Sequence, residues 1–453
     1  MRAFTSADPF LWGAATSAHQ IEGYNSASDW WHWESQGRIE GGVRSGPATD
    51  HWNRRDADLD IAKRLHLNSY RFSIEWAKVE PEPGVWDESA WAWYSELLES
   101  CAKRGLIPMA TLHHFTLPQW VADRGGFTNA ETVERFLRFV REAVIRLGSR
   151  IPYWCTLNEP LVLVLGGYLG KFMPPAVYDP KGAGLALSNL LRAHVGAYDL
   201  IHRLRTRAEG LYAHLPLQVG LAHNFLDFKA HRRFHPIDQL LSGRLRSFYN
   251  DAWVRAVLGE DPGFHVPFLL PRGPEVPEAR GRRSIDFLGV NYYTKAYVEW
   301  RPKQSGNETS PDLPIGVTFA RRKESQSDLG WAIHPEGMLR ILVSLKSTGL
   351  PLIITENGIA DREDRHREEY LRLHLKAIAQ ARSQGVDVRG YYVWSLLDNF
   401  EWIKGFWPRF GLAQVDYESF ERKLQPSALC FRAWIQKHGG FAPPSLDVFS
   451  DSH

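Results

Sequence analysis

Two glutamates occupy matching positions in two short motifs far apart in the chain. Glu159 lies in the sequence TLNEP, residues 156–160, and Glu356 lies in ITENG, residues 354–358. Each ends a run that is typical of a buried strand, and a Pro or Asn-Gly turn follows. Two carboxyl groups presented at strand ends are what paired acid and nucleophile chemistry requires. We therefore predict that Glu159 and Glu356 form the active site, although one such glutamate alone serves equally well as a structural ion-pair partner.

Eight segments of the chain have the apolar or alternating pattern of strands, and helical segments separate them. The predicted strands are Leu11 to Thr16, Ser69 to Ile74, Ile107 to Leu112, Tyr153 to Asn158, Gln218 to His223, Phe287 to Asn291, Leu352 to Glu356 and Val388 to Trp394. Strand and helix repeated eight times without a linker predicts an α/β fold, a (β/α)8 TIM barrel. We expect a single catalytic domain over residues 1–453.

Two of the intervening helices have clear sequence signals. The segment from Thr128 to Gly148 opens with the Thr-x-x-Glu spacing of a capping box and continues with one apolar stripe. A second helix is predicted from about Arg365 to Gly385, with Leu371, Leu375 and Ile378 facing the sheet.

The barrel prediction brings the two glutamates to one rim. In such barrels the active site lies at the C-terminal ends of the strands. Glu159 ends the fourth predicted strand and Glu356 the seventh, so we expect them to face each other across the mouth. Three long connections are expected to form loops over that mouth: Ile21 to Asn53, Tyr168 to Ala186 and Trp300 to Trp331.

Composition argues against several classes of partner. A net charge of +2 with 23% charged residues gives no field that would attract nucleic acid or an anionic membrane. Apolar runs are too short to span a bilayer, and residues 1–9 lack the apolar core of a signal peptide. The three cysteines have neither disulfide nor zinc spacing. We expect a cytoplasmic protein without cofactor or metal, acting on a small neutral or polar molecule.

Tryptophan is unusually frequent, with 18 in the chain, many of them beside polar residues. Packing in a large core explains any one of them about as well as sugar stacking does, in which an indole face lies against the C–H groups of a pyranose.

Further motifs accompany the two glutamates along essentially the whole chain. They are FLWGAAT at 10–16 with Gln20 and Glu22, YRFSIEW at 70–76, LHHF at 112–115, NYY at 291–293 and WSLLDNFEW at 394–402. In this order and spacing the chain resembles glycoside hydrolase family 1, the retaining β-glucosidases and β-galactosidases. The resemblance implies an exo-β-glycosidase that hydrolyses terminal non-reducing β-D-glucosides, with galactosides and fucosides also accepted, through a covalent glycosyl-enzyme.

The resemblance also assigns roles to matching positions. Glu356 is expected to be the nucleophile and Glu159 the general acid and base, with Arg71 and Tyr293 holding Glu356 ionised. For sugar binding it implies Asn158 at the 2-hydroxyl, Trp394 as the floor, Asn291 on the side of the acid, and Gln20, His114, Glu401 and Trp402 at the remaining hydroxyls.

The leaving-group side is less well defined. His19 replaces the usual tyrosine, and residues 170–175 depart from the usual acceptor loop. Trp331, Phe172 and Trp407 are candidates for aglycone contacts, with core packing as an equal alternative for each.

Single residues argue against several other activities. Adjacent His113 and His114 point to opposite faces of a strand and so cannot share a metal, which disfavours a metal-dependent hydrolase. Intact Glu159 disfavours a thioglucosidase, and both intact glutamates disfavour a silent carbohydrate-binding relative. Glu401 would repel a sugar phosphate; nearby Lys404 and Arg409 are expected to have surface or ion-pair roles. The sequence leaves open the choice among glucose, galactose and fucose, the extent of transglycosylation, and whether homo-oligomers form.

Overall fold

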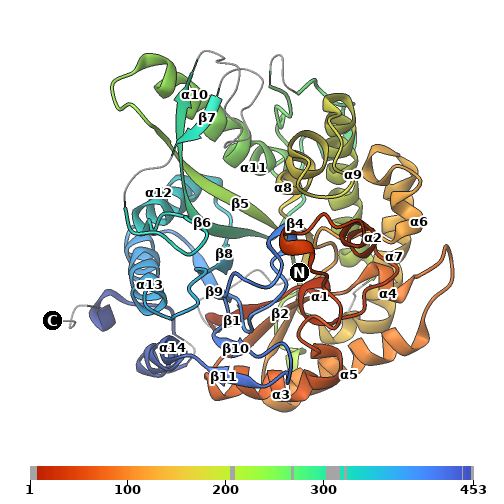
Figure 1. The fold of residues 1–453 in the computed structure, drawn as a ribbon, viewed down its shortest axis with the longest axis vertical. Coiled ribbons are helices and arrows are strands. Elements are labelled where there is room, and N and C mark those ends of the chain that lie inside the picture. The colour runs from red at the N-terminus through yellow and green to blue at the C-terminus, as the bar shows by residue number, and fades with distance from the viewer. Residues whose placement is uncertain are drawn as a thin grey trace.

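Eight parallel strands close into a barrel at the centre of the molecule, with helices around them (Figure 1). The computed structural model describes residues 8–204, 210–266, 270–301, 317–320, 324–440 and 442–449. The barrel strands are β1 (Leu11–Ala15), β2 (Ser69–Ser73), β3 (Ile107–Thr111), β4 (Tyr153–Asn158), β5 (Gln218–Ala230), β6 (Phe287–Trp300), β8 (Leu352–Asn357) and β9 (Val388–Trp394). Pairing runs from β5 through β4, β3, β2, β1, β9 and β8 to β6, and the β5–β6 pairing closes the barrel. The predicted (β/α)8 fold is confirmed.

One main helix follows each strand and covers the outside of the barrel. These are α3 (His51–Arg64), α5 (Glu88–Arg104), α7 (Glu131–Leu147), α9 (Pro180–Leu204), α11 (Ala252–Val257), α12 (Pro335–Leu345), α13 (Arg367–Ser383) and α14 (Pro426–Lys437). In α13, Leu371, Leu375 and Ile378 are fully buried, as predicted. An apolar stripe that packs on the sheet stabilises such a helix more than its own propensity does.

The barrel has two cores. One fills its interior with side chains that include Leu11, Met109, Tyr153, Phe287 and Tyr392, and the other lies between the strands and the surrounding helices. Gly13 lies where the interior is tightest, because a Cβ at this position would come within 2.3 Å of the Tyr392 ring. The interior is therefore a packed core and not a channel.

Two predicted strands end too early in the sequence interpretation. Strands β5 and β6 were expected to end at His223 and Asn291, but they pair as far as Ala230 and Trp300, well beyond the barrel rim. Polar residues interrupt the apolar pattern there, while the backbone continues to pair. The antiparallel strand β7 (Val317–Ala320) and helix α10 (Pro236–Arg246) join this extension.

The predicted capping box of α7 is wrong. Thr128 belongs to a 3-10 turn, Gly126–Thr128, and its Oγ1 donates to the Gly125 carbonyl at 2.7 Å. The helix begins at Glu131, whose N–H donates to Oδ1 of Asn129 at 3.0 Å. The positive φ angles of Gly125 and Gly126 turn the chain here, so the Thr-x-x-Glu spacing falls across the turn.

The connections over the mouth contain short helices: α1 (Ala18–Ile21), α2 (Asp29–Ser35), α4 (Trp76–Val79), α6 (Gln119–Ala122) and α8 (Pro160–Leu165). A small hairpin of β10 (Ala413–Val415) and β11 (Arg422–Leu424) follows β9. Part of the predicted loop from Trp300 to Trp331 lies outside the described residues. Among the helices described, none is both long and apolar enough to cross a membrane.

Candidate active site

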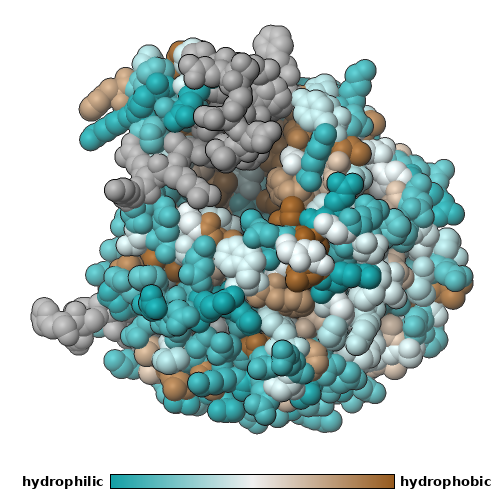
Figure 2. All heavy atoms as spheres, in the orientation of Figure 1, coloured by the Kyte–Doolittle hydropathy of each residue, from teal (hydrophilic) through white to brown (hydrophobic). Residues whose placement is uncertain are grey.

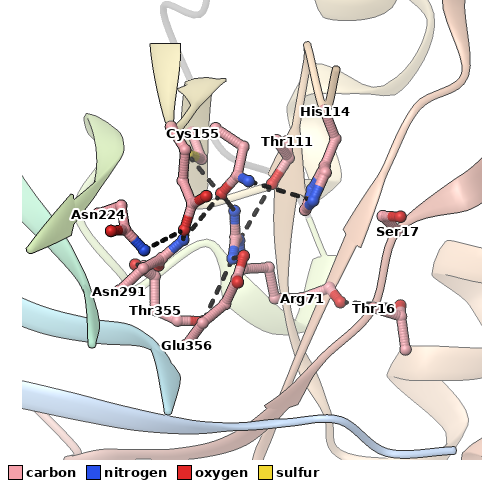
Figure 3. Close-up of polar contacts among 12 residues, drawn as sticks. Thr16, Ser17, Arg71, Thr111, His114, Cys155, Asn224, Asn291, Thr355 and Glu356 are labelled. Carbon is pink, nitrogen blue, oxygen red and sulfur yellow. Dashed lines mark hydrogen bonds and ion pairs between the residues drawn. The ribbon is translucent and has the colours of Figure 1, made fainter. Parts of the chain in front are cut away.

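Glu356 receives two strong hydrogen bonds at the C-terminal end of β8. Arg71 donates to its Oε1 (Figure 3) and the Tyr293 hydroxyl donates to its Oε2, each at 2.6 Å. Arg71 is fully buried and Glu356 is 3% exposed. A guanidinium and a phenol aimed at one carboxylate both stabilise its negative charge.

Glu159 has a different set of partners at the end of β4. Asn291 and Asn224 donate to its Oε1 at 2.8 and 3.1 Å. Its backbone is in the left-handed region, with φ 46° and ψ 54°, at the cap of α8, and its N–H donates to the Ala222 carbonyl. A non-glycine residue held in this conformation by its surroundings is common at functional sites.

The two carboxyl groups belong to one hydrogen-bond network. Arg71 donates to Oδ1 of Asn158 at 2.8 Å, and Nδ2 of Asn291 donates to the same oxygen at 3.1 Å as well as to Glu159. Thr355 donates to Oδ1 of Asn291 at 2.6 Å, which fixes the orientation of that amide. An unbroken chain of contacts therefore runs from Glu356 through Arg71, Asn158 and Asn291 to Glu159.

The surroundings of Glu159 favour its protonated form. Burial, and then the negative charge of Glu356, raise the pKa of Glu159 to about 8, against the weaker opposing effect of its amide donors. At neutral pH the site thus combines a protonated Glu159 with Glu356, whose charge Arg71 balances. Two identical side chains can thus differ in proton affinity because their surroundings differ.

His114 is held as a neutral hydrogen-bond donor. Because Oδ1 of Asn158 accepts two hydrogen bonds, its Nδ2 must be the group that donates to Nε2 of His114, at 3.1 Å. Nε2 is then an acceptor and the ring proton lies on Nδ1, which has no partner among the described residues. Burial, and then the charge of Arg71, hold the pKa of His114 well below its usual value.

The sugar-stacking candidates gather beside His114. Trp394, at the end of β9, lies 6.0 Å from His114 with the rings inclined by 24°, and Trp402 lies 6.0 Å away at 18°. His19, the residue in place of the usual tyrosine, is parallel to Trp402 at 5.7 Å and 6°. Burial lowers the pKa of His19 to about 3, so an uncharged ring supports Trp402.

Gln20 and Glu401 form the polar edge of the same region. Gln20 is fully buried; its Nε2 donates to Asn399 and to the Phe400 carbonyl, and Ser17 donates to its Oε1. Burial, and then the charge of Glu356, raise the pKa of Glu401 to about 8, while hydrogen bonds from Trp394 and Gln20 oppose the shift. Oε2 of Glu401 has no partner in the described part of the chain.

The three outer aromatic residues lie in different surroundings. Trp331 is 36% exposed, and its ring lies 5.6 Å from that of Tyr293. Tyr293 in turn donates a hydrogen bond to Glu356. Phe172, 41% exposed, packs closely over Gly166 and Gly170 in the turn after α8. Trp407 is partly exposed, and its carbonyl accepts a hydrogen bond from Arg362. Of these three residues, Trp331 thus lies against Tyr293, a hydrogen-bond partner of Glu356.

Comparisons with known proteins agree with this geometry. The profile of glycosyl hydrolase family 1 matches residues 3–440. The chain belongs to glycosyl hydrolase family 1.

Relatives cover nearly the full length of this family 1 glycosidase. It is similar to a β-galactosidase of Pyrococcus woesei, at 30% identity over 95% of this chain and 97% of the relative. A bifunctional β-D-glucosidase/β-D-fucosidase of Bifidobacterium breve is 32% identical over 95% and 98%. Among solved structures, the family 1 β-glucosidase of Thermotoga maritima in complex with isofagomine lactam has a TM-score of 0.85 at 30% identity, covering 96% of this chain and 99% of that one. The protein is therefore a glycoside hydrolase of a family that retains anomeric configuration.

Residues expected to lie outside the chemistry of this glycosidase have structural partners. His113 points away from His114 and packs edge-on against Phe127 and Phe136. Lys404 pairs with Glu40 at 2.8 Å and Arg409 with Asp398 at 3.1 Å, so the predicted ion-pair roles are confirmed. No cluster of three or more potential metal-ligating side chains occurs within the described ranges.

Two residues of the site were missed in the sequence interpretation. Asn224 donates to Glu159 and accepts from the Tyr249 hydroxyl at 2.8 Å. It directly follows the predicted end of the fifth strand, where a polar residue would point into the mouth, and this position was the available signal. His19 was noted as a departure but not as a support for Trp402, because stacking between distant loops leaves no local pattern.

Replacing Glu356 with Gln is expected to lower the pKa of Glu159 from about 8, because the neighbouring negative charge disappears. Burial remains, so the pKa should stay above the ordinary value of 4.5 for a glutamate. Titration of ¹³C-carboxyl-labelled glutamate by NMR measures this shift. Glu401→Gln is the matched control and should shift the pKa of Glu159 less; equal shifts in the two variants would contradict the interpretation.

Proposed function

We propose that this family 1 glycosidase removes terminal β-D-glucosyl units from the non-reducing end of its substrates by double displacement. Glu356 is the nucleophile and Glu159 the general acid and base. The observation that supports this assignment best is the inequality of the partners: Glu356 is bound by Arg71 and Tyr293, whereas Glu159 is bound by two neutral amides.

In the first step Glu356 attacks the anomeric carbon while Glu159 donates its proton to the oxygen of the leaving group, and the glycosidic bond breaks. The new ester removes the negative charge of Glu356, so the pKa of Glu159 falls and its carboxylate can accept a proton from water. That water attacks the anomeric carbon and releases the sugar and Glu356. If a second sugar hydroxyl attacks instead, the same intermediate gives transglycosylation.

The glycone site is proposed to use the polar groups around Trp394. Asn158 lies beside the acid and binds the 2-hydroxyl, where a hydrogen bond that strengthens in the transition state contributes to rate. Nδ1–H of His114 supplies a further donor. Gln20, Glu401 and Trp402 complete the hydroxyl contacts, while Trp394 floors the ring and Asn291 orients Glu159.

The aglycone leaves past Trp331. Phe172 and Trp407 are candidates for contacts with its outer part. We also propose that the chain acts in the cytoplasm, which the unpaired thiols of Cys101 and Cys155 support, and that any homo-oligomer forms away from the mouth so that the substrate can enter.

Glucosides are proposed as the principal substrates, with galactosides and fucosides also accepted. Support comes from the activities named for the Pyrococcus and Bifidobacterium relatives, and from a Gln20–Glu401 edge that can bind a 4-hydroxyl in either orientation. On p-nitrophenyl glycosides that differ only in the sugar, kcat/KM should be highest for these three β-glycosides. A higher value for a 6-phosphorylated or an α-linked substrate would contradict the proposal.

Glu356→Ala should lower turnover of an aryl β-glucoside by several orders of magnitude, because no covalent intermediate can form. Azide fits the vacated space and should partly restore release of the aryl group, giving the α-glucosyl azide with inverted configuration. Product analysis by NMR identifies the anomer. Activity that persists without azide, or a β-configured azide, would exclude Glu356 as the nucleophile; a parallel assay of the wild-type enzyme after exhaustive chelation should show no loss.

The basic limb of the pH profile should belong to Glu159. The acid must carry its proton in the first step, so kcat/KM should fall as pH rises through about 8. A 2,4-dinitrophenyl leaving group needs no proton, so Glu159→Gln should keep much of its kcat/KM on that substrate and lose the basic limb. An unchanged limb in the variant would assign the ionisation to another group, with Glu401 as the first candidate.

A further inference from the structure

A short turn that packs on β5 contacts the residues around the catalytic acid. Helix α10 ends in one π-helical turn, Ser247–Asp251, which lies along β5. Hydrophilic side chains cover much of the α10 region in Figure 2, so the outer side of this helix faces solvent while its end turns toward the barrel. A π-helical turn is uncommon, and such turns are frequent at functional sites.

Three hydrogen bonds fasten this turn to β5. Nδ2 of Asn250 donates to the Leu226 carbonyl at 2.8 Å, and the Leu226 N–H donates to Oδ1 of Asn250 at 3.1 Å. Nε2 of His223 donates to the Tyr249 carbonyl at 2.7 Å. His223 and Asn250 are both buried, so water does not compete for these contacts. The backbone of Tyr249 is therefore held beside Asn224.

The Tyr249 hydroxyl fixes which end of the Asn224 amide points to Glu159. It donates to Oδ1 of Asn224 at 2.8 Å, and Nδ2 of the same amide donates to Oε1 of Glu159 at 3.1 Å. Within the described ranges this hydroxyl makes no other hydrogen bond. An inverted Asn224 amide would present its NH2 group to Tyr249 and leave the phenol proton without an acceptor. Burial, and then the charge of Glu159, raise the pKa of Tyr249 well above its ordinary value, so the phenol keeps this proton.

This arrangement makes the two oxygens of Glu159 unequal. Asn224 and Asn291, which lie side by side in Figure 3, both donate to Oε1, and no described residue forms a hydrogen bond with Oε2. Because Oε1 already accepts two hydrogen bonds, the acidic proton belongs on Oε2, which stays available to a leaving group. The carbonyl of an inverted Asn224 amide would instead draw that proton to Oε1.

We propose that Tyr249 is a positioning residue for the catalytic acid: through Asn224 it keeps the proton of Glu159 on the oxygen that is available to the leaving group. The inference rests on the proposed function, since it requires Glu159 to be the proton donor of that mechanism. The same fixed donor also stabilises the carboxylate form of Glu159 that accepts a proton from water in the second step. Tyr249 needs no contact with the substrate, so its effect depends on how much the leaving group needs a proton.

Tyr249→Phe tests the proposal, because it keeps the ring and removes the hydroxyl. The Asn224 amide can then invert whenever Glu159 is protonated. On phenyl β-glucoside, whose leaving group needs the proton, kcat/KM should fall about two- to tenfold, the change that one neutral hydrogen bond corresponds to. On 2,4-dinitrophenyl β-glucoside, which needs no proton, kcat/KM should change less than about twofold. Because both substrates are assayed on one preparation, the ratio of the two values is independent of the folded fraction.

The pH profile gives a second readout that a merely structural role of Tyr249 would not move. A hydrogen bond donated to the carboxylate lowers its pKa, so loss of the fixed donor should raise the pKa of Glu159 above about 8. The basic limb of kcat/KM on phenyl β-glucoside should therefore move to higher pH in Tyr249→Phe.

Two further variants complete the experiment. Asn224→Ala removes the amide through which Tyr249 acts, so adding Tyr249→Phe to it should not change the ratio of the two kcat/KM values further. Tyr198→Phe is the matched control, because it removes a phenol that donates to Asp286 at 2.9 Å on the outer helix α9. It should leave both the ratio and the basic limb as in the wild-type enzyme.

Equal losses on the two glucosides in Tyr249→Phe, an unmoved basic limb, or a further change of the ratio in the double variant would overturn the proposal. A different result would refute the proposed function itself: Glu159→Gln losing no more activity on phenyl than on 2,4-dinitrophenyl β-glucoside. The two failures are therefore distinguishable.

Discussion

The buried guanidinium of Arg71 connects four strands of the barrel. From β2 it donates to Thr111 on β3, Asn158 on β4, and the Thr355 carbonyl and Glu356 carboxylate on β8. Because the ion pair is buried, removing either partner is strongly destabilising: an unpaired buried charge costs about 3–5 kcal/mol. The closed barrel makes the contact possible, since only closure brings a residue of β2 within reach of β8.

The same arginine makes the two carboxyl groups unequal. Arg71 donates hydrogen bonds to Glu356 and to the amide of Asn158 and none to Glu159. Glu159 therefore receives only neutral donors and remains buried near an anion. Burial and like charge therefore favour its protonated form. The proposed roles of acid and nucleophile follow from which carboxylate Arg71 reaches, not from any difference between the side chains. In the proposed mechanism, esterification of Glu356 removes one of the two causes of the high proton affinity of Glu159, which suits it to act next as a base.

The strand extensions of β5 and β6 are where the sequence interpretation was weakest. Their backbone pairs as far as Ala230 and Trp300 although polar side chains break the apolar pattern. These strand extensions do not have one buried and one exposed face, so the usual alternation of apolar and polar residues does not apply to them. Ending the fifth strand at His223 hid Asn224, which directly follows it, and the stacking of His19 on Trp402 joins distant loops and so leaves no local signal. Predicted helix α13, by contrast, was right because one apolar stripe on one sheet is a local requirement.

What the sequence determined by itself was the order of strands and helices, the strand ends that carry Glu159 and Glu356, and, through its motifs, the family. These depend on short-range periodicity and on residue types at fixed spacing. Only the tertiary structure decided the hydrogen bonds that set the two carboxylates apart, the ring proton of His114, and the support of Trp402 by His19. Each joins residues from separate strands or loops, and contact at such separations depends on barrel closure and not on any local pattern.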